Sequence, residues 1–388
     1  SGGLRIPIFF APDRGDNLPP EWEGDYGINL DAASHTVIVL LADFQMARVV
    51  DGGTGDAWKA FFQEGLRRAP SGASPHFVLG IAIDSEGYDL ADQRHMLAAE
   101  SNPLRGKAGS ADPNAKGFDE WLSRVADEIA LQITIRAIQK LDPRVVPTQG
   151  RAPIRLFLSH AKADLTANED DPVRFVENDV KELPIDYWFD AAEIPPSEDF
   201  AKEISKGICD CSIVVSFQTD HYASRSWCQR EILDAKRLSI PILVVDALKT
   251  GEPRNFPYLG NLPTIHWSGN DPKTEARKIV GRAAREALRF MYNRLALQIS
   301  TENSDGEVVL AAAPEALTLV HAPAIQSKPK RFLYPDPPLT EHELDVLNAL
   351  LPTATFSTPL TKLAQRLKPL NPIVAVSISN SGDLARFG

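Results

Sequence analysis

The sequence predicts an α/β fold in which parallel strands are covered by helices on both faces. The chain has 388 residues, 43% hydrophobic and 24% charged, which is typical of a globular protein with two or three domains. β-branched runs such as Ser212 to Ser216 lack polar alternation, as strands buried on both faces of a parallel sheet do. Helical patterns separate these runs, and alternation of this kind favours a parallel sheet.

The clearest series of such elements lies between Ile154 and Leu297. In chain order we expect a strand and loop at 154–160, a second strand and loop at 188–196, a helix at 200–208, a strand at 212–216, a helix within 221–232, a strand at 240–245 and a long helix at 271–297. The strands are short and apolar, whereas the helices mix apolar and charged residues.

Glu231 is the most informative residue of this series. It lies on the first turns of the helix that follows the strand at 212–216, and ligand sites in parallel sheets lie at the carboxyl ends of strands. Trp227 precedes it by four residues, so both side chains share one helix face. An aromatic surface beside a carboxylate suits a cationic ring as substrate.

The ordered series, with the motif from His221 to Ile232, resembles the Toll/interleukin-1 receptor (TIR) domain. The resemblance covers about a third of the chain and implies a parallel-sheet, flavodoxin-like fold. Two departures stand out. Pro195-Pro196-Ser197 replaces the usual Pro-Gly in the second-strand loop, which carries assembly contacts in the family, and a basic residue found after the first strand is displaced here to Lys162.

The TIR resemblance implies two functional classes, namely scaffolds that only associate and enzymes that cleave the nicotinamide–ribose bond of NAD. The catalytic acid of the enzymes falls at Glu231, and the resemblance points to Ser159, His160, Phe200 and Trp227 as substrate-binding residues. A carboxylate stabilises the oxocarbenium-like ribose left by departing nicotinamide. The expected activity is that of an NAD+ nucleosidase or ADP-ribosyl cyclase. NAD would be the substrate, and neither a cofactor nor a metal is implied.

Structural interpretations of the same residues remain open at this stage. Most helix glutamates are solvated and have no chemical role, so Glu231 could belong to a non-catalytic TIR scaffold that mediates protein–protein assembly. Trp227 could pack in the core, as could Cys228. Ser159 could satisfy a loop amide, and His160 could be an ordinary surface histidine.

Composition argues against some classes of binding partner and indicates a cellular compartment. A formal net charge of -11 gives no basic surface for nucleic acid or an anionic membrane. No apolar run is long enough to span a bilayer, and the amino end has no signal-peptide core. The three cysteines show no metal-ligand spacing, so we expect reduced thiols and a cytoplasmic protein.

The region before residue 147 repeats the order of these elements with weak sequence similarity. We expect strands at 4–10, 34–41 and 76–83, a helix from Trp58 to Leu66 and a long helix at 118–141. Four residues after Trp58 stands Phe62, where the second copy has Glu231. This pattern predicts a degenerate, non-catalytic TIR-like unit, although two unrelated α/β units could share the same generic order.

The carboxyl-terminal region is expected to contain a short helix and a strand. Thr340 and Glu343 form a capping-box pattern that opens a helix through Leu351. The run from Pro372 to Ser379 has a buried-strand pattern and resembles the opening strand of a SLOG domain, a Rossmann-like nucleotide sensor. That resemblance implies a missing sensor domain that would bind a nucleotide second messenger, whereas an ordinary terminal strand is the alternative.

The resulting organisation is a degenerate TIR-like domain at 1–146, a linker at 147–153, a TIR domain at 154–299, a connector at 300–339 and a helix with a terminal strand at 340–388. The resemblance implies an effector or signal generator in bacterial antiphage defence that is activated by self-association through TIR–TIR contacts. The residues leave open hydrolysis against cyclisation, the activating signal, the oligomer size and whether another nucleoside is the true substrate.

Overall fold

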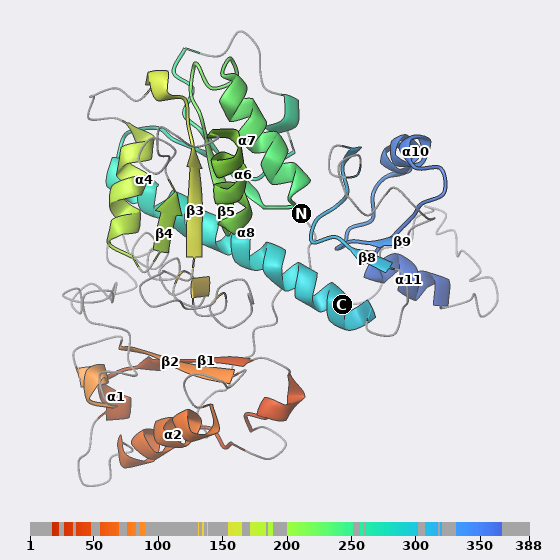
Figure 1. Ribbon diagram of the computed structural model, residues 1–388. Helices are drawn as coiled ribbons and strands as arrows, with labels where there is room; N and C mark the ends of the chain where they lie inside the picture. Colours follow the sequence, from red (N-terminus) through yellow and green to blue (C-terminus); the bar gives the residue numbers. More distant parts are fainter. Residues whose placement is uncertain are drawn as a thin grey trace, which may run out of the picture.

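The described residues of the computed structural model form three separate parallel sheets (Figure 1). It describes residues 18–22, 27–33, 36–47, 55–69, 76–82, 86–90, 131, 134–135, 138, 154–164, 171–183, 185–188, 200–250, 257–259, 261–301, 307–316, 319 and 331–366. The strands expected at 4–10 and 372–379, the linker at 147–153 and the loop with Pro195 to Ser197 lie outside the described residues.

The central sheet has five parallel strands in the order β4-β3-β5-β6-β7. Their bounds are β3 Ile154–Ser159, β4 Ile185–Trp188, β5 Ile213–Gln218, β6 Ile242–Asp246 and β7 Thr264–His266. This order, in which the first strand lies between the second and the third, is that of the flavodoxin-like fold. The predicted fold class is therefore confirmed, although β4 begins earlier than the sequence pattern indicated and ends at Trp188.

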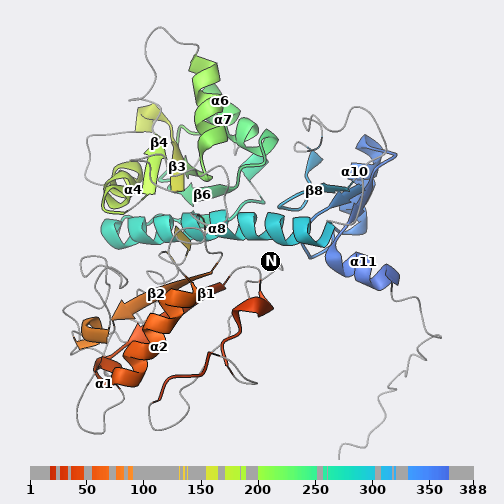
Figure 2. The same cartoon turned by 60° about the horizontal axis from the view of Figure 1, so that its bottom comes forward.

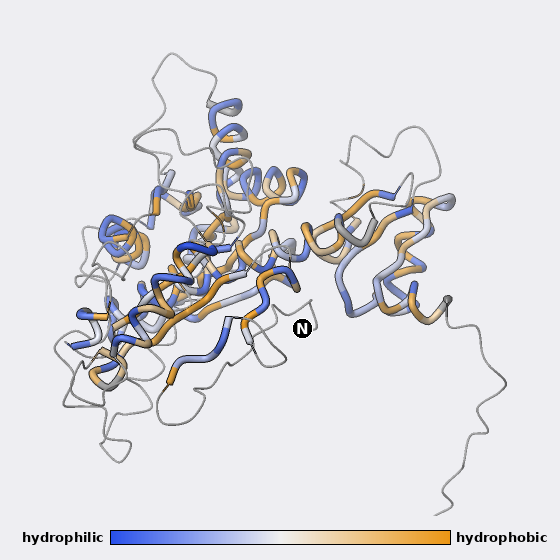
Figure 3. Tube along the Cα trace, turned by 90° about the horizontal axis from the view of Figure 1, so that it is seen from below, coloured by the Kyte–Doolittle hydropathy of each residue, from blue (hydrophilic) through white to orange (hydrophobic). Residues whose placement is uncertain are grey.

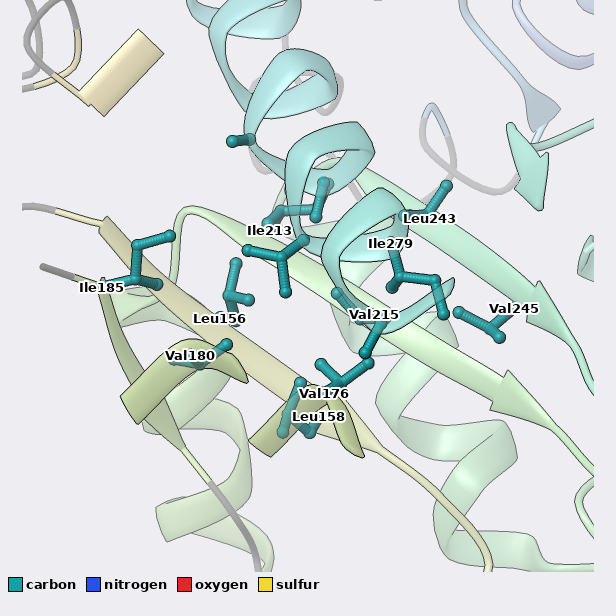
Figure 4. Packing of buried hydrophobic residues seen from close by; sticks show 14 of the residues in the cluster. Leu156, Leu158, Val176, Val180, Ile185, Ile213, Val215, Leu243, Val245 and Ile279 are labelled. Atoms are coloured by element: carbon teal, nitrogen blue, oxygen red, sulfur yellow. The ribbon is translucent and has the colours of Figure 1, made fainter. Parts of the chain in front are cut away.

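Alternate residues of each strand point to opposite faces of the sheet, and each face is covered by helices. One face carries α4, Pro172–Lys181, and α8, Pro272–Thr301. Figure 4 shows Val176 and Val180 of α4 and Ile279 of α8 packed against strand residues. The other face carries α6, Phe200–Asp210, and α7, Ser226–Arg237. In Figure 3 the helices carry hydrophobic and hydrophilic residues around their axes, as helices with one face on a sheet do.

The packing of α6 on β4 depends on a glycine. The rings of Phe157 and Trp188 stack with centroids 4.6 Å apart, and a methyl group on Gly207 would lie 3.0 Å from the Trp188 ring. Both rings are buried. Close-packed interiors tolerate added volume poorly, so α6 approaches the sheet closely only because residue 207 has no side chain.

We expect Gly207→Ala to destabilise the protein by about 1 kcal/mol, because overpacking outweighs the higher helix propensity of alanine. Gly281→Ala in α8 is the matched control, since no described heavy atom lies within 4 Å of the added methyl group. That control should be stabilising by about 0.4–1 kcal/mol. Urea unfolding of both variants measures the difference, and an equal effect of the two substitutions would contradict the packing argument.

The amino-terminal part contains a two-stranded parallel sheet. β1, Thr36–Ala42, and β2, His76–Ala82, pair along their whole length and are joined through α2, Gly55–Arg68. A short helix, α1, spans Phe44–Ala47. Trp58 and Phe62 of α2 are buried in a core with β1 and β2. The predicted strands at 34–41 and 76–83 and the helix at 58–66 are confirmed, while the kinship of this unit with the second copy stays a prediction.

The described residues of the segment between the two units pack on the central sheet. Leu131, Ile135 and Ile138, all helical, belong to the same hydrophobic cluster as α4 and α8. They lie in the range 1–146 that the sequence assigns to the first domain. The end of that range therefore contributes to the core of the second.

The carboxyl-terminal part contains the third sheet, ordered β10-β9-β8. Its strands are β8 Glu307–Val309, β9 Arg331–Leu333 and β10 Thr355–Ser357, and its helices are α10 Glu341–Leu350 and α11 Pro359–Arg366. Thr340 and Glu343 form the predicted capping box at the start of α10. Helix α8 reaches from the central sheet to this part in both views (Figures 1 and 2). Among the described residues, no helix is long and apolar enough to cross a membrane.

Candidate active site

The candidate site lies where β3 and β5 end side by side. Ser159 is the last residue of β3, and its register partner on β5 is Ser216. In the strand order observed here, β3 and β5 flank the topological switch point, at which the strand order reverses. Ligands bind at this point in open α/β sheets. Phe157 packs on the α7 side of the sheet, and the period of two along a strand places Ser159 on that same side.

The carboxylate of Glu231 meets Ser159 at this point. Glu231 belongs to α7 and is only 2% exposed. The hydroxyl of Ser159 donates a hydrogen bond of 2.5 Å to Oε2 of Glu231. The interpretation of Glu231 as a solvated surface residue is therefore wrong. A buried carboxylate costs desolvation energy that its hydrogen bonds must offset, so its position is strongly specified by the fold.

Tyr222 completes the contact from the loop between β5 and α7. Its side chain is fully buried, and its phenol oxygen lies 2.6 Å from Oγ of Ser159. Burial, with neighbouring Cys228 and Glu231, raises the pKa of Tyr222 well above its usual value, while the hydroxyls of Ser159 and Ser216 act in the opposite direction. The phenol therefore keeps its proton at neutral pH. Sequence analysis missed Tyr222, although it lies within the motif that identified Glu231.

His160 holds the end of β3 against α7. Its side chain is buried, which excludes the interpretation as a surface histidine, and its Nδ1 lies 3.1 Å from the carbonyl oxygen of Leu158. The carbonyl of His160 accepts a hydrogen bond of 3.4 Å from the thiol of Cys228. Cys228 is buried in the cluster beneath α7, as its packing interpretation predicted. His160 thus follows Ser159 directly in the chain, and its backbone is hydrogen-bonded to α7.

Asp164 links the loops that follow β3 and β5. One of its carboxylate oxygens, Oδ2, accepts hydrogen bonds from the hydroxyl of Thr219 at 2.6 Å and from the backbone N–H of His221 at 3.1 Å. Its other oxygen lies 2.5 Å from Nδ1 of His221. Tyr222 directly follows in the same loop. The sequence offered no signal for this link, because the partners are 55 or more residues apart.

Trp227 and Phe200 are the two remaining sequence candidates. Trp227 is 42% exposed, and the guanidinium of Arg230 lies 5.5 Å from its ring centroid. The core-packing interpretation of Trp227 is therefore wrong. Its ring is exposed in the first turn of α7, whereas the side chain of Glu231, one turn further along, is buried. Phe200 is the first residue of α6, and its side chain lies outside the described residues.

The described part of the chain contains no cluster of side chains that could bind a metal ion. Within it, no group of three or more His, Cys, Asp or Glu side chains is placed to hold a metal ion. Cys209, Cys211 and Cys228 are free thiols. The chemical capacity of the site is that of a buried carboxylate and two hydroxyls.

The central domain matches a known family of domains. Residues 156–280 match the family model for the TIR domain. Among solved structures, the chain is similar to the TIR domains of the activated Roq1 resistosome directly recognizing the pathogen effector XopQ, at 18% identity, covering 34% of this chain and 84% of that chain with a TM-score of 0.22. No curated protein matches. The strand order and the family match together identify residues 156–280 as a TIR domain.

Proposed function

We propose that the TIR domain cleaves the nicotinamide–ribose bond of NAD with Glu231 as the catalytic carboxylate. The observation that carries the proposal is the buried carboxylate of Glu231, bound to Ser159 where β3 and β5 end. A carboxylate held in a water-poor site stabilises positive charge more strongly than one in water. NAD offers such charge at the bond in question, first on the nicotinamide ring and then on the ribose.

The reaction needs only one carboxylate because the leaving group departs without a proton. The electrons of the glycosidic bond go to the ring nitrogen of nicotinamide, which becomes neutral, and the ribose becomes oxocarbenium-like. In hydrolysis, the oxygen of water then bonds to the anomeric carbon and a proton is released, which yields ADP-ribose. In cyclisation, a nitrogen of the adenine forms that bond instead. Glu231 would stabilise the ribose cation in both reactions.

We infer that substrate entry requires a rearrangement above Glu231, since its exposed fraction is 2%. Association between TIR domains would supply that rearrangement, and activity would then depend on local protein concentration. In the setting that the family resemblance implies, the chain would act as an effector or signal generator in bacterial antiphage defence. The trigger that we propose is a nucleotide second messenger.

A scaffold function is the second candidate, and exposed apolar side chains on α7 favour it. Trp227 and Leu233 of α7 are 42% and 37% exposed, and exposed apolar side chains of this kind suit a protein–protein contact. A scaffold would need these exposed side chains but no access to Glu231. The two functions therefore differ in whether NAD is consumed when the chains are brought together.

The test is nicotinamide release from NAD by the full chain, measured first in dilute solution and then with the protein concentrated on beads. We expect release to rise by more than the added protein accounts for, because association completes the site. Parallel incubations with nicotinamide riboside and with inosine test whether another nucleoside is preferred. Absence of nicotinamide release on beads would favour the scaffold, and faster cleavage of inosine would move the substrate away from NAD.

A further inference from the structure

Three side chains from separate segments form one chain of hydrogen bonds at the site. Tyr222 comes from the loop after β5, Ser159 from the end of β3 and Glu231 from α7. The phenol oxygen lies 2.6 Å from Oγ of Ser159, and Oγ lies 2.5 Å from Oε2 of Glu231. All three side chains are buried. Water therefore competes little for these contacts, and each one depends on the others for its partner.

The positions of the protons follow from the chemistry of the groups. A carboxylate only accepts hydrogen bonds, so the single proton of Ser159 is directed to Glu231. The remaining capacity of Oγ is as an acceptor, and the phenol of Tyr222 is the group that can donate to it. Hydrogen bonds that run in one direction strengthen one another. The phenol thus polarises the hydroxyl that holds the carboxylate.

The ring of Tyr222 is fixed well enough to act in this way. It is 0% exposed and packs in the cluster that includes Phe157, Cys228 and Ile232. Its backbone N–H donates to the carbonyl of Thr219, and its own carbonyl accepts from the N–H of Arg225. The phenol oxygen consequently has one position relative to β3 and α7. A side chain that is already held by packing can orient its neighbour without losing further conformational entropy at each turnover.

We propose that Tyr222 is a positioning residue that acts on Glu231 through Ser159 during the proposed reaction. This inference rests on the proposed NAD cleavage. Tyr222 itself need not touch the substrate. Its donated hydrogen bond orients the Ser159 hydroxyl, which in turn fixes the direction of Oε2. The role assigned to Ser159 differs from the substrate-binding role expected from sequence, because a relay changes the rate of the chemical step while a binding contact changes KM.

Tyr222→Phe removes the phenol oxygen and leaves the buried ring in place. We expect kcat for NAD cleavage to fall about tenfold with KM unchanged. This is the effect expected from losing the one hydrogen bond that orients Ser159 towards the carboxylate. Tyr187→Phe on β4 is the matched control, because the Tyr187 phenol also donates a hydrogen bond, in this case to the carboxylate of Glu177 at 2.9 Å. The control removes the same group from the same domain and should leave kcat at the parent value.

The double variant of Tyr222→Phe and Ser159→Ala decides whether Tyr222 acts through Ser159. We expect Ser159→Ala alone to lower kcat and the second substitution to add little, because the relay is already broken. If the two substitutions lower kcat independently, so that their effects multiply in the double variant, the inference is overturned. A raised KM with unchanged kcat in Ser159→Ala would also overturn it. If Tyr222→Phe fails to fold, a raised KM with unchanged kcat in Ser159→Ala still overturns the inference, because the relay requires Ser159 to act on the chemical step.

Failure of the inference and failure of the proposed function give different results. A parent chain that releases no nicotinamide on beads overturns both. A parent chain that releases nicotinamide, with a Tyr222→Phe variant of equal kcat and equal melting temperature, overturns only the role of Tyr222. A melting temperature that falls while kcat of the folded protein stays constant assigns Tyr222 to packing and likewise overturns the relay.

Discussion

Replacing Glu315 with glutamine is expected to lower the free energy of unfolding by about 2–3 kcal/mol. Lys236 of α7 is only 5% exposed, and its Nζ lies 2.6 Å from a carboxylate oxygen of Glu315. Removing the negative partner leaves a buried ammonium without compensating charge, which costs about 3–5 kcal/mol in a fully buried pair. The side chain of Glu315 is 28% exposed, so water offsets part of the loss and the lower value applies.

Lys236→Met is the matched control for the same ion pair. Methionine fills most of the volume of the lysine stem, and Glu315 is exposed enough to be hydrated once its partner is gone. We therefore expect this variant to cost less than about 1 kcal/mol. Urea unfolding of the two variants measures the asymmetry. Equal losses would mean that the pair acts only through mutual attraction and that Lys236 is not effectively buried.

This ion pair joins the helix of the candidate site to the carboxyl-terminal part. Lys236 lies five residues after Glu231 on α7. Glu315 accepts a backbone hydrogen bond from Leu319, and Leu319 is buried with Phe332 and Leu347 in the carboxyl-terminal core. The amide of Asn261 donates to the second carboxylate oxygen of Glu315 at 3.3 Å. The position of α7 is thus fixed by β3 at one end and by this contact at the other.

Three strands of the central sheet, β3, β5 and β6, were predictable from sequence because they are unusually simple, whereas β4 was expected to begin where it ends and β7 was not expected. The runs at 154–159, 213–217 and 242–245 are mostly apolar, with Arg155, Ser159 and Ser216 as their polar residues, and too short for buried helices. The long α8 and the capping box at Thr340 follow equally local rules. In each case the information lies within a single stretch of chain, so no knowledge of tertiary contacts was needed.

The contacts of the site were less predictable because they join distant segments. Ser159 and Glu231 are 72 residues apart, and Ser159 and Tyr222 are 63 apart. The period of two along β3 could have placed Ser159 under α7. Nothing local indicates that the phenol of Tyr222 reaches the same hydroxyl. Helical spacing alone also put Trp227 and Glu231 on one face, whereas the sheet buries Glu231 and leaves Trp227 at the surface.

Position along the chain did not predict which sheet the helical residues before the central sheet pack against. Leu131, Ile135 and Ile138 are apolar at helical spacing, which predicts one buried helix face but not the partner of that face. The core that they join contains Ile154, after the sequence boundary at residue 146. Whether that face packs on the amino-terminal or the central sheet depends on tertiary contacts, which the periodicity does not contain.

Glu231→Gln is expected to reduce nicotinamide release by about 100- to 1000-fold, the loss typical of removing one group that stabilises transition-state charge. Glutamine has nearly the same shape and keeps an oxygen that accepts the hydrogen bond from Ser159, so the fold should persist. It carries no negative charge, however, and cannot stabilise the ribose cation. KM is expected to change little, since the lost interaction is strongest in the transition state.

The measurement that tests the central claim most directly is nicotinamide release on beads by the parent chain, by Glu231→Gln and by Glu182→Gln. Glu182 is the matched control because its side chain is 76% exposed and lies in the same domain. The account predicts release by the parent and by Glu182→Gln, with the signal lost in Glu231→Gln. Equal release by all three proteins, each shown to be folded, would contradict the assignment of Glu231 as the catalytic carboxylate.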